Sequence, residues 1–155
     1  YITSPIVMKL LEERLPVTSI TVMVQKEAEV RLGAEVGTRE CGAGTFGVRT
    51  YCKPKQLFSV SSGSFYTSPN VDHVVVRFER IESEHGARDE AFLFQVVRSA
   101  FSQRRKTLAN PVSSMRGIPK KEVLAALDRC AVKATARAEE MKFEDWIRLA
   151  NELRN

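Results

Sequence analysis

The residues in this sequence with the clearest chemical role are cations that gather toward its C-terminal side. Residues 91–121 contain seven lysines and arginines and no aspartate or glutamate. The seven are Arg98, Arg104, Arg105, Lys106, Arg116, Lys120 and Lys121. A block of one charge sign attracts a polyanion and raises its association rate in a salt-dependent way. The other interpretation is a solvated helix face, and the charges alone do not choose between the two.

The net charge of +5 in this chain of 155 residues comes from the same part of the sequence. Residues 1–85 carry ten Lys and Arg against ten Asp and Glu, whereas residues 86–155 carry fourteen against nine. No large apolar patch accompanies the cations, and no apolar run is long enough to span a bilayer, so a membrane is not the expected partner. The pattern favours nucleic acid.

One glycine motif could hold a phosphate but lies in the wrong context. Residues 42–47 (GAGTFG) match G-x-G-x-x-G, the dinucleotide-binding fingerprint. That fingerprint requires a strand before it and an acidic residue after it. Residues 35–40 are instead polar and turn-like, and residues 60–70 contain no acid. We interpret these glycines as close-packing positions in a helix and assign no cofactor-binding role to them.

Cysteine and histidine are too sparse for a metal site. Cys41, Cys52 and Cys130 have no Cys-x-x-Cys spacing, and His73 and His85 have no ligand cluster around them. We therefore expect reduced, partly buried thiols, a cytoplasmic location and no metal. The chain begins at Tyr1 without a signal sequence, and we expect it to be a piece cut from a longer protein.

Hydrophobic patterning predicts an α/β layer before residue 80. Two β-branched runs are typical of strands, and Ser4 followed by Pro5 is typical of a helix start. The prediction is helices over 4–15, 26–32 and 41–51, strands over 19–24, 57–60 and 71–78, and a turn at 61–64. The alternation indicates a sheet covered by helices on both faces, with 19–24 as a buried strand.

Everything after a polar linker at 81–89 is predicted to be helical, over 90–109, 120–129 and 143–153. On a helical wheel, Arg98, Arg105 and Lys106 lie outside the apolar arc of the first of these helices, where they can meet phosphates. Arg104 falls inside the arc. Either it is buried against a carboxylate or carbonyl, or the helix bends before it.

Several stretches carry a family resemblance. They are, in chain order, Tyr1 to Pro5 (YITSP), Val22 to Glu27 (VMVQKE), Ser64-Phe65 with Pro69 to Asp72 (PNVD), Ala100 to Leu108 (AFSQRRKTL), and Arg137 to Glu139 (RAE) with the helix around Trp146. Together they resemble the KsgA/RsmA family, the bacterial small-subunit (16S) rRNA adenine dimethyltransferases. The first four resemble the tail of that family's catalytic loop, its strand ending in Gln-Lys-Glu, its Phe-x-Pro-x-Pro-x-Val-Asp segment and its C-terminal basic motif.

The resemblance implies a fold and a division of the chain. Residues 1–80 correspond to the C-terminal part of a Rossmann-like class I methyltransferase sheet, without the half that binds S-adenosylmethionine. Residues 90–155 correspond to a small all-α RNA-binding domain. The implied activity is dimethylation of two adjacent adenines near the 3′ end of small-subunit rRNA, in a cytoplasmic pre-ribosomal subunit. This chain alone is expected to be inactive.

The resemblance also implies site residues. Phe65 matches the family's Phe, which would stack on the flipped target base, and Tyr1 lies next to the catalytic loop. The implied RNA-binding residues are Arg98, Arg105, Lys106, Arg116, Lys120 and Lys121. No S-adenosylmethionine ligand of the family falls within this chain.

Departures from the family pattern leave alternatives open. Ser68 stands where the family usually has Pro, and residues 41–44 are richer in glycine than the family's stretch. One alternative is the large-subunit rRNA adenine methyltransferase of the macrolide-resistance type, which lacks the run at 102–108. Another is a non-catalytic nucleic-acid-binding relative. With its neighbouring strand missing, 19–24 is also expected to present an unpaired edge through which the chain self-associates, unless the first helix covers that edge.

Overall fold

The computed structural model describes residues 3–67, 69–82 and 85–154. The chain forms two compact units. Unit 1 consists of Tyr1–Glu35 and Glu40–Ser83, and unit 2 consists of Val36–Arg39 and Glu84–Asn155. A short segment from the first half of the sequence therefore belongs to the second unit.

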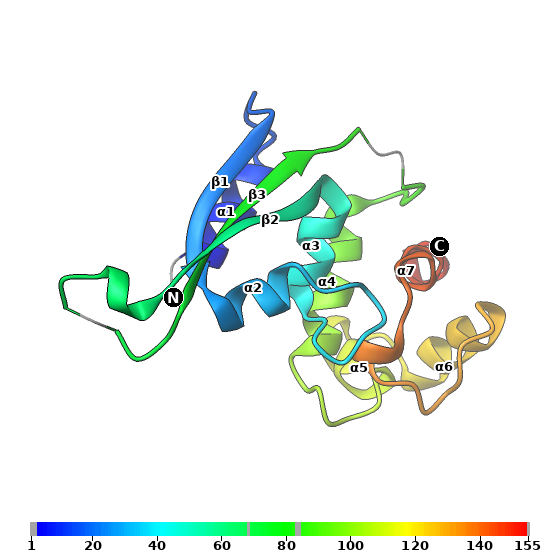
Figure 1. The fold of residues 1–155 in the computed structure, drawn as a ribbon. Helices are drawn as coiled ribbons and strands as arrows, with labels where there is room; N and C mark the ends of the chain where they lie inside the picture. The colour runs from blue at the N-terminus through cyan, green and yellow to red at the C-terminus, as the bar shows by residue number, and fades with distance from the viewer. Residues whose placement is uncertain (1–2, 68, 83–84, 155) are drawn as a thin grey trace. The chain divides into compact units, whose positions relative to one another are not determined.

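Unit 1 is a small sheet with helices. Its elements are α1 (Thr3–Glu12), β1 (Ser19–Gln25), α2 (Lys26–Leu32), α3 (Ala43–Tyr51), β2 (Cys52–Val60), the 3₁₀ turn η1 (Ser62–Ser64) and β3 (His73–Arg80) (Figure 1). The strands run in the order β1-β3-β2, and both neighbouring pairs are antiparallel. β3 is the last strand in the sequence but the central strand of the sheet. It pairs with its sequence neighbour β2 on one side and with the distant β1 on the other.

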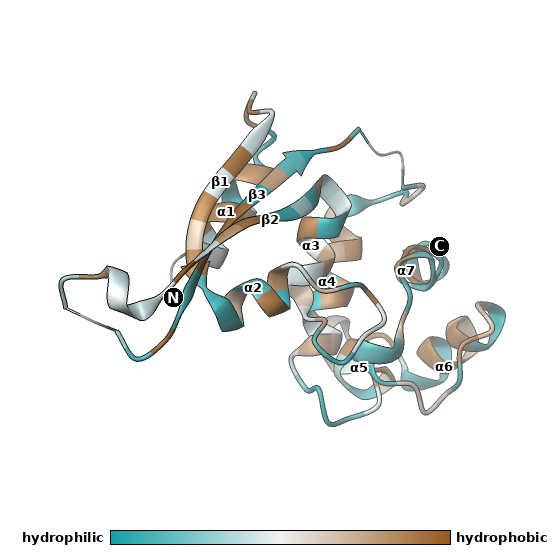
Figure 2. Ribbon diagram, in the orientation of Figure 1, coloured by the Kyte–Doolittle hydropathy of each residue, from teal (hydrophilic) through white to brown (hydrophobic). Residues whose placement is uncertain are grey.

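One face of this sheet carries the core of unit 1. Val74, Val76 and Phe78 of β3 are buried in one cluster with Val7 of α1 and Val48 of α3. Along β3, buried residues alternate with more exposed ones, and Figure 2 shows the apolar residues of the strands in brown. Burial of one alternate set of strand residues against helices fixes the register, since a one-residue slip would expose the whole set.

The other face of the sheet is exposed, so the prediction of a sheet covered on both faces is wrong for the described residues. Met23 on β1 and Phe58 on β2 both lie opposite Val75 on this face, and they are 47% and 56% exposed. The prediction of 19–24 as a buried strand is wrong as well, because only Val24 of β1 is buried. The pattern is that of an antiparallel sheet with one packed face.

Unit 2 is helical after the connection at residues 85–89. Its elements are α4 (Glu90–Phe101), α5 (Ala109–Arg116), α6 (Lys120–Arg129), the 3₁₀ turn η2 (Ala138–Glu140) and α7 (Phe143–Arg154). Asp89 caps α4 by accepting a hydrogen bond from the Phe92 amide at 3.0 Å. Trp146 of α7 is fully buried, and its ring centroid lies 5.8 Å from that of Phe101. These contacts give unit 2 its own core.

The predicted helix over 90–109 is two elements rather than one. It ends at Phe101, and α5 begins at Ala109 after a turn. The sequence pattern predicts no helix over 110–116, because Pro111, Gly117 and Pro119 interrupt it there. Pro111 is the third residue of α5, within the first turn, where backbone amides have no partner inside the helix and a proline is tolerated.

Candidate nucleic-acid interface

Arg105 and Lys106 lie in the loop between α4 and α5, not on a helix as the wheel assumed. Both side chains are exposed. The loop closes on itself, with the Lys106 amide donating to the Gln103 carbonyl at 2.9 Å. Leu108 holds its far end, since this residue is fully buried and its amide donates to the Ala136 carbonyl at 2.9 Å. Two cations are therefore presented on an anchored loop.

Arg104, the first cation of this run, contacts the protein itself. Its Nη2 donates to the carbonyl oxygen of Arg39 at 2.5 Å and to Glu139 Oε2 at 3.2 Å. The helix ends before Arg104, as one of the two alternatives from the sequence proposed. The other alternative, burial against a carbonyl or carboxylate, is wrong, because the side chain meets both groups but remains 41% exposed. Arg104 thus holds the loop in place while its neighbours face solvent.

The contact partner Arg39 belongs to a segment that sequence reasoning missed. Residues 36–39 are part of unit 2, and Arg39 is exposed. Gly37 adopts φ +90°, and a Cβ there would lie 3.5 Å from the carbonyl oxygen of Met141. Glycine is favoured by that backbone conformation. No local pattern could signal this arrangement, because Arg39 and Arg104 are 65 residues apart in the sequence.

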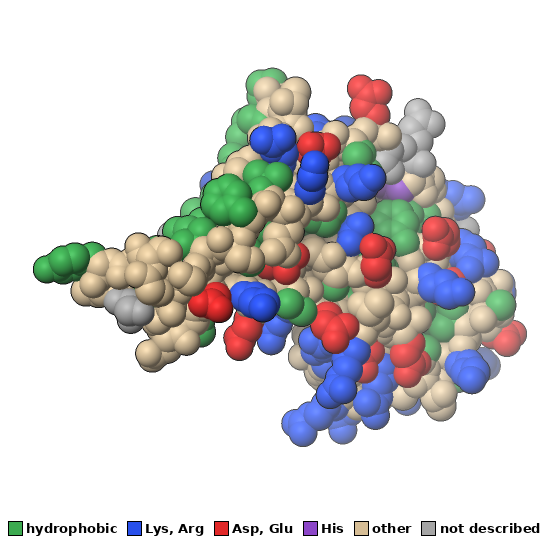
Figure 3. Space-filling view, viewed as in Figure 1, with side chains coloured by type: hydrophobic (Ala, Val, Ile, Leu, Met, Phe, Trp, Pro, Cys, Tyr) green, Lys and Arg blue, Asp and Glu red, His purple; other side chains and the backbone are tan. Residues whose placement is uncertain are grey.

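The remaining predicted RNA-binding residues lie around the same helices. Arg98 is exposed on α4, with its guanidinium carbon 5.8 Å from the centre of the Phe94 ring. Lys120 and Lys121 are exposed in the first turn of α6, where cations oppose the helix dipole. Arg116 ends α5, and its side chain lies outside what the structure describes. Figure 3 shows Lys and Arg side chains gathered over the loop that joins α4 to α5.

Phe65 lies outside the strands, directly after η1. Its side chain is half-buried, and its ring centroid lies 5.0 Å from that of His73 with an angle of 52° between the planes. Asp72 holds this connection, because the Ser62 amide donates to Asp72 Oδ1 at 3.0 Å. The adjacent Tyr66 is fully exposed. The stacking role of Phe65 stays a prediction, and Tyr1, the other predicted catalytic position, lies outside the described residues.

The glycine segment at 42–47 does not fit a phosphate-binding loop. No strand precedes α3 among residues 33–42, all of which the structure describes. The Gly42 amide donates to Thr45 Oγ1 at 3.0 Å, and Thr45 Oγ1 in turn donates to the Arg31 carbonyl. A Cβ on Gly44 would lie 3.4 Å from Leu32 Cδ2, so this glycine permits close packing of α3 on α2. The hydrogen bonds and close packing of this segment therefore serve the fold and not a ligand.

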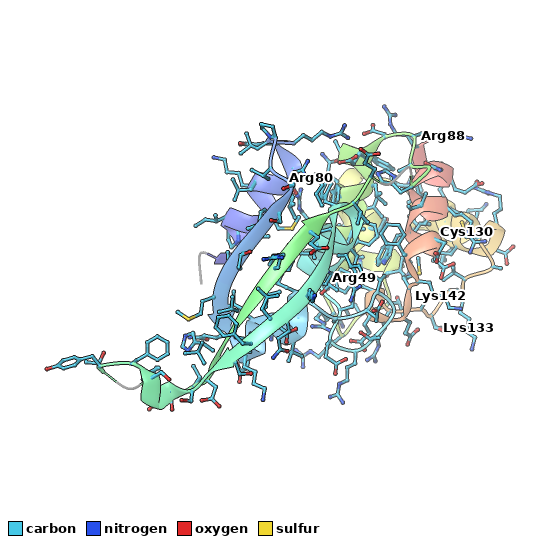
Figure 4. The ribbon with its side chains drawn as sticks, turned by 45° about the horizontal axis from the view of Figure 1, so that its top comes forward. Arg49, Arg80, Arg88, Cys130, Lys133 and Lys142 are labelled. Carbon is cyan, nitrogen blue, oxygen red and sulfur yellow. The ribbon has the colours of Figure 1, made fainter. Side chains whose placement is uncertain are left out.

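The cysteines are buried free thiols. Burial raises the pKa of the Cys52 thiol from 9.0 to about 11, although the nearby Arg80 at the end of β3 (Figure 4) lowers it in part. Burial likewise raises the pKa of Cys130. Because the thiolate is the reactive form, these two thiols are poor nucleophiles at neutral pH.

The described residues contain neither a metal-binding cluster nor a membrane-spanning helix. No three or more His, Cys, Asp and Glu side chains come together there as a group that could hold a metal ion. Nor does this part of the chain contain a helix with the length and apolar character needed to cross a bilayer.

Solved structures resemble this fold. A dimethyladenosine transferase from Plasmodium falciparum matches with a TM-score of 0.77 and 25% identity, over 96% of this chain and 61% of that chain. The 23S rRNA methyltransferase ErmE matches with a TM-score of 0.65 and 23% identity, over 99% of this chain and 62% of that one. The predicted class, part of a Rossmann-like methyltransferase sheet followed by helices, is confirmed.

Sequence relatives give the family. Proteins named "Ribosomal RNA small subunit methyltransferase A" from Bacillus mycoides (strain KBAB4) and Bacillus cereus (strain B4264) are 40% identical to this chain over 157 residues. The match covers 99% of this chain, which spans about half, 54%, of the length of those relatives. The family model described as ribosomal RNA adenine dimethylase matches residues 1–155. With the resemblance seen in the sequence confirmed in this way, the chain belongs to the ribosomal RNA adenine dimethylase family.

Proposed function

We propose that this chain works as part of an enzyme that dimethylates two adjacent adenines near the 3′ end of small-subunit rRNA. The observation that carries the proposal is the 40% identity, over 99% of the chain, to relatives named as small-subunit rRNA methyltransferases. The chain spans 54% of those relatives, so the activity is assigned to the whole protein and not to these residues alone. The substrate is RNA within a pre-ribosomal subunit in the cytoplasm.

Two parts of the chain have different tasks in this proposal. Residues 1–80 contribute to the catalytic domain, residues 81–89 link the domains, and residues 90–155 bind RNA. The RNA-binding residues are Arg98, Arg105, Lys106, Arg116, Lys120 and Lys121. Support comes from the exposed positions of Arg105 and Lys106 on an anchored loop and from the absence of acids between residues 91 and 121. Cations that contact phosphates position an RNA without reading its sequence.

In this methyl transfer the main contribution of the protein is to position the reacting groups. An exocyclic adenine amine is a poor nucleophile because its lone pair is delocalised into the ring, so orientation and exclusion of water matter more than a strong base. S-adenosylmethionine, when bound to the whole enzyme, supplies the methyl group, and we assign none of its ligands to this chain. Phe65 holds the flipped base by stacking, which is worth about 1–3 kcal/mol per base.

The alternatives are less well supported. The likeness to the 23S rRNA methyltransferase is at 23% identity and concerns the fold alone. The run Ser102 to Leu108 (SQRRKTL) favours the small-subunit enzymes, as far as the resemblance goes. A non-catalytic relative would keep the RNA-binding loop but lose methylation, which an activity measurement detects directly.

A chimera tests the proposal with a defined assay. The matching segment of the Bacillus cereus relative is replaced by this chain, and dimethylated adenine in small ribosomal subunits is measured by primer extension. We expect the chimera to methylate the small-subunit RNA and to leave large-subunit RNA unmodified. A folded chimera that binds S-adenosylmethionine but methylates neither RNA would support the non-catalytic relative, and methylation of large-subunit RNA alone would support the other alternative.

A further inference from the structure

Unit 2 contains an open cavity of about 460 Å³ between α4 and α5. Its walls come from three places: Gln95 and Arg98 on α4, Gln103 in the following loop, and Ser114 and Met115 on α5. None of the described residues that line it is acidic. The volume falls within the range of about 300–1,000 Å³ that is usual for sites of small ligands.

Two of the serine hydroxyls that line this cavity already have hydrogen-bond partners within the protein. Ser99 Oγ donates to the Pro111 carbonyl at 2.7 Å, which ties α4 to the first turn of α5. Ser102 Oγ donates to the Ser99 carbonyl at 2.6 Å. The side-chain amides of Gln95 and Gln103, in contrast, have no hydrogen-bond partner in the part of the chain that the structure describes. The polar groups available to a ligand are therefore on the walls.

The wall chemistry matches a nucleotide. A glutamine amide offers a donor and an acceptor side by side, the arrangement that pairs with the edge of a base, above all adenine. Arg98 supplies a cation for a phosphate, and the partly exposed Met115 supplies apolar surface for the face of a base. A base inside a helix cannot enter such a cavity, whereas an unpaired base can be turned out into it.

We propose that this cavity binds a single unpaired nucleotide of the RNA, next to the basic loop that carries Arg105 and Lys106. The inference rests on the proposed function and adds to it the form of RNA that unit 2 selects. The basic loop supplies affinity for phosphates in any sequence, and the cavity supplies a preference for RNA with an extruded base.

Two RNA hairpins that differ by one bulged adenosine test this inference on the 155-residue chain by fluorescence anisotropy. We expect the bulged hairpin to bind about tenfold more tightly, the order of discrimination that one good amide–base pairing gives. The double variant Gln95→Ala/Gln103→Ala should lose this preference and keep its affinity for the unbulged hairpin. Its melting temperature should stay unchanged, because both side chains are exposed. The control is Gln56→Ala, an exposed glutamine on β2 in unit 1.

The outcomes separate this inference from the proposed function. Equal binding of both hairpins by the wild-type chain, or a preference that survives the double variant, overturns the cavity assignment while RNA binding stands. Failure to bind either hairpin contradicts RNA binding by unit 2 itself. A last outcome would also overturn the inference. If free adenosine monophosphate displaces the bulged hairpin at a concentration equal to the dissociation constant of that hairpin, the cavity is a site for free mononucleotides.

Discussion

Arg104 and Glu139 form an ion pair across unit 2, with 3.2 Å between Arg104 Nη2 and Glu139 Oε2. The same nitrogen donates to the carbonyl oxygen of Arg39, so one guanidinium joins the basic loop, η2 and the segment 36–39. Of the three consecutive cations Arg104, Arg105 and Lys106, Arg104 therefore has a structural role. Exposed ion pairs contribute only about 0.2–1 kcal/mol, but the bond to a backbone carbonyl adds to it.

The first prediction separates Arg104 from its neighbour. Arg104→Ala should lower the free energy of unfolding by about 1–2 kcal/mol, because it removes the ion pair and the bond to Arg39 together. Arg105→Ala should change it by less than about 0.5 kcal/mol, as is usual for an exposed surface residue. Urea denaturation of the two variants measures this difference. Equal loss of stability in both variants would show that Arg104 has no special structural role.

The second prediction concerns the salt dependence of RNA binding. Arg105→Ala or Lys106→Ala should weaken binding and reduce the slope of log K against log salt by about 0.7–1 each, the loss of one phosphate contact. Binding of a hairpin RNA at several salt concentrations gives the slope. Lys9→Ala on α1 is the matched control, an exposed cation in unit 1 that should leave the slope unchanged. An unaltered slope in the Arg105 and Lys106 variants would remove these residues from the interface.

Periodicity predicted the helices with strong apolar faces but not the edge strand β2. The sequence signal placed a strand only at 57–60, whereas β2 begins at Cys52, directly after α3. Lys53, Pro54 and Lys55 conceal the strand because they break the apolar pattern, and these residue types are typical of edge strands. The sheet order could not be obtained from periodicity, since it depends on contacts between residues far apart in the sequence.

The candidate site was predictable in composition and not in geometry. The cations were predicted from their clustering in the sequence, and Phe65 was predicted from the family resemblance. The helical-wheel placement of Arg105 and Lys106 was wrong because it assumed that α4 continues past Phe101. These residues lie instead in a loop that closes at Lys106. The partners of Arg104 are set by tertiary contacts with residues 36–39 and with η2, and no local rule reaches them.

The third prediction tests Phe65 in the chimeric enzyme. Phe65→Ala should lower the methylation rate by about tenfold or more while the melting temperature changes little, because the side chain is only half-buried and its loss removes a stacking contact. Phe78→Ala is the comparison, since this residue is buried in the core of unit 1 and its truncation should cost about 3–5 kcal/mol. Methylation and thermal denaturation are measured on the same preparations. A melting temperature that falls with Phe65→Ala as far as with Phe78→Ala would identify Phe65 as a core residue.

The fourth prediction is that the 155-residue chain neither binds S-adenosylmethionine nor methylates RNA. The glycine segment at 42–47 uses its first amide within the fold, and the resemblance assigns no cofactor ligand to any residue of this sequence. Isothermal titration should show no heat of binding at micromolar concentrations, with the chimera as the positive control. Saturable micromolar binding by the chain alone would contradict the prediction.

The fifth prediction follows from the two edges of the sheet. The β2 edge carries Lys53, Pro54 and Lys55 and a register shift between Gln56 and Phe58. The β1 edge carries no charged residue and no proline from Ser19 to Gln25, and the described residues provide no strand on its outer side. Natural sheets use charges, prolines and bulges to prevent edges from pairing with other chains, and only β2 has them.

We therefore expect the isolated chain to self-associate through β1, with two copies pairing antiparallel around a twofold axis. Val7 and Leu11 of α1 pack into the core with the buried residues of β3, so we expect α1 to leave the β1 edge free. Light scattering over a range of concentrations should show dimers or larger species, and Met23→Lys should return the chain to a monomer. Phe58→Lys is the matched control, since it places the same charge on the same exposed face but on the other edge strand, and it should leave association intact. Dissociation by both variants would locate the contact on the sheet face. A wild-type chain that stays monomeric at every concentration would show that the unguarded edge is not sufficient for pairing.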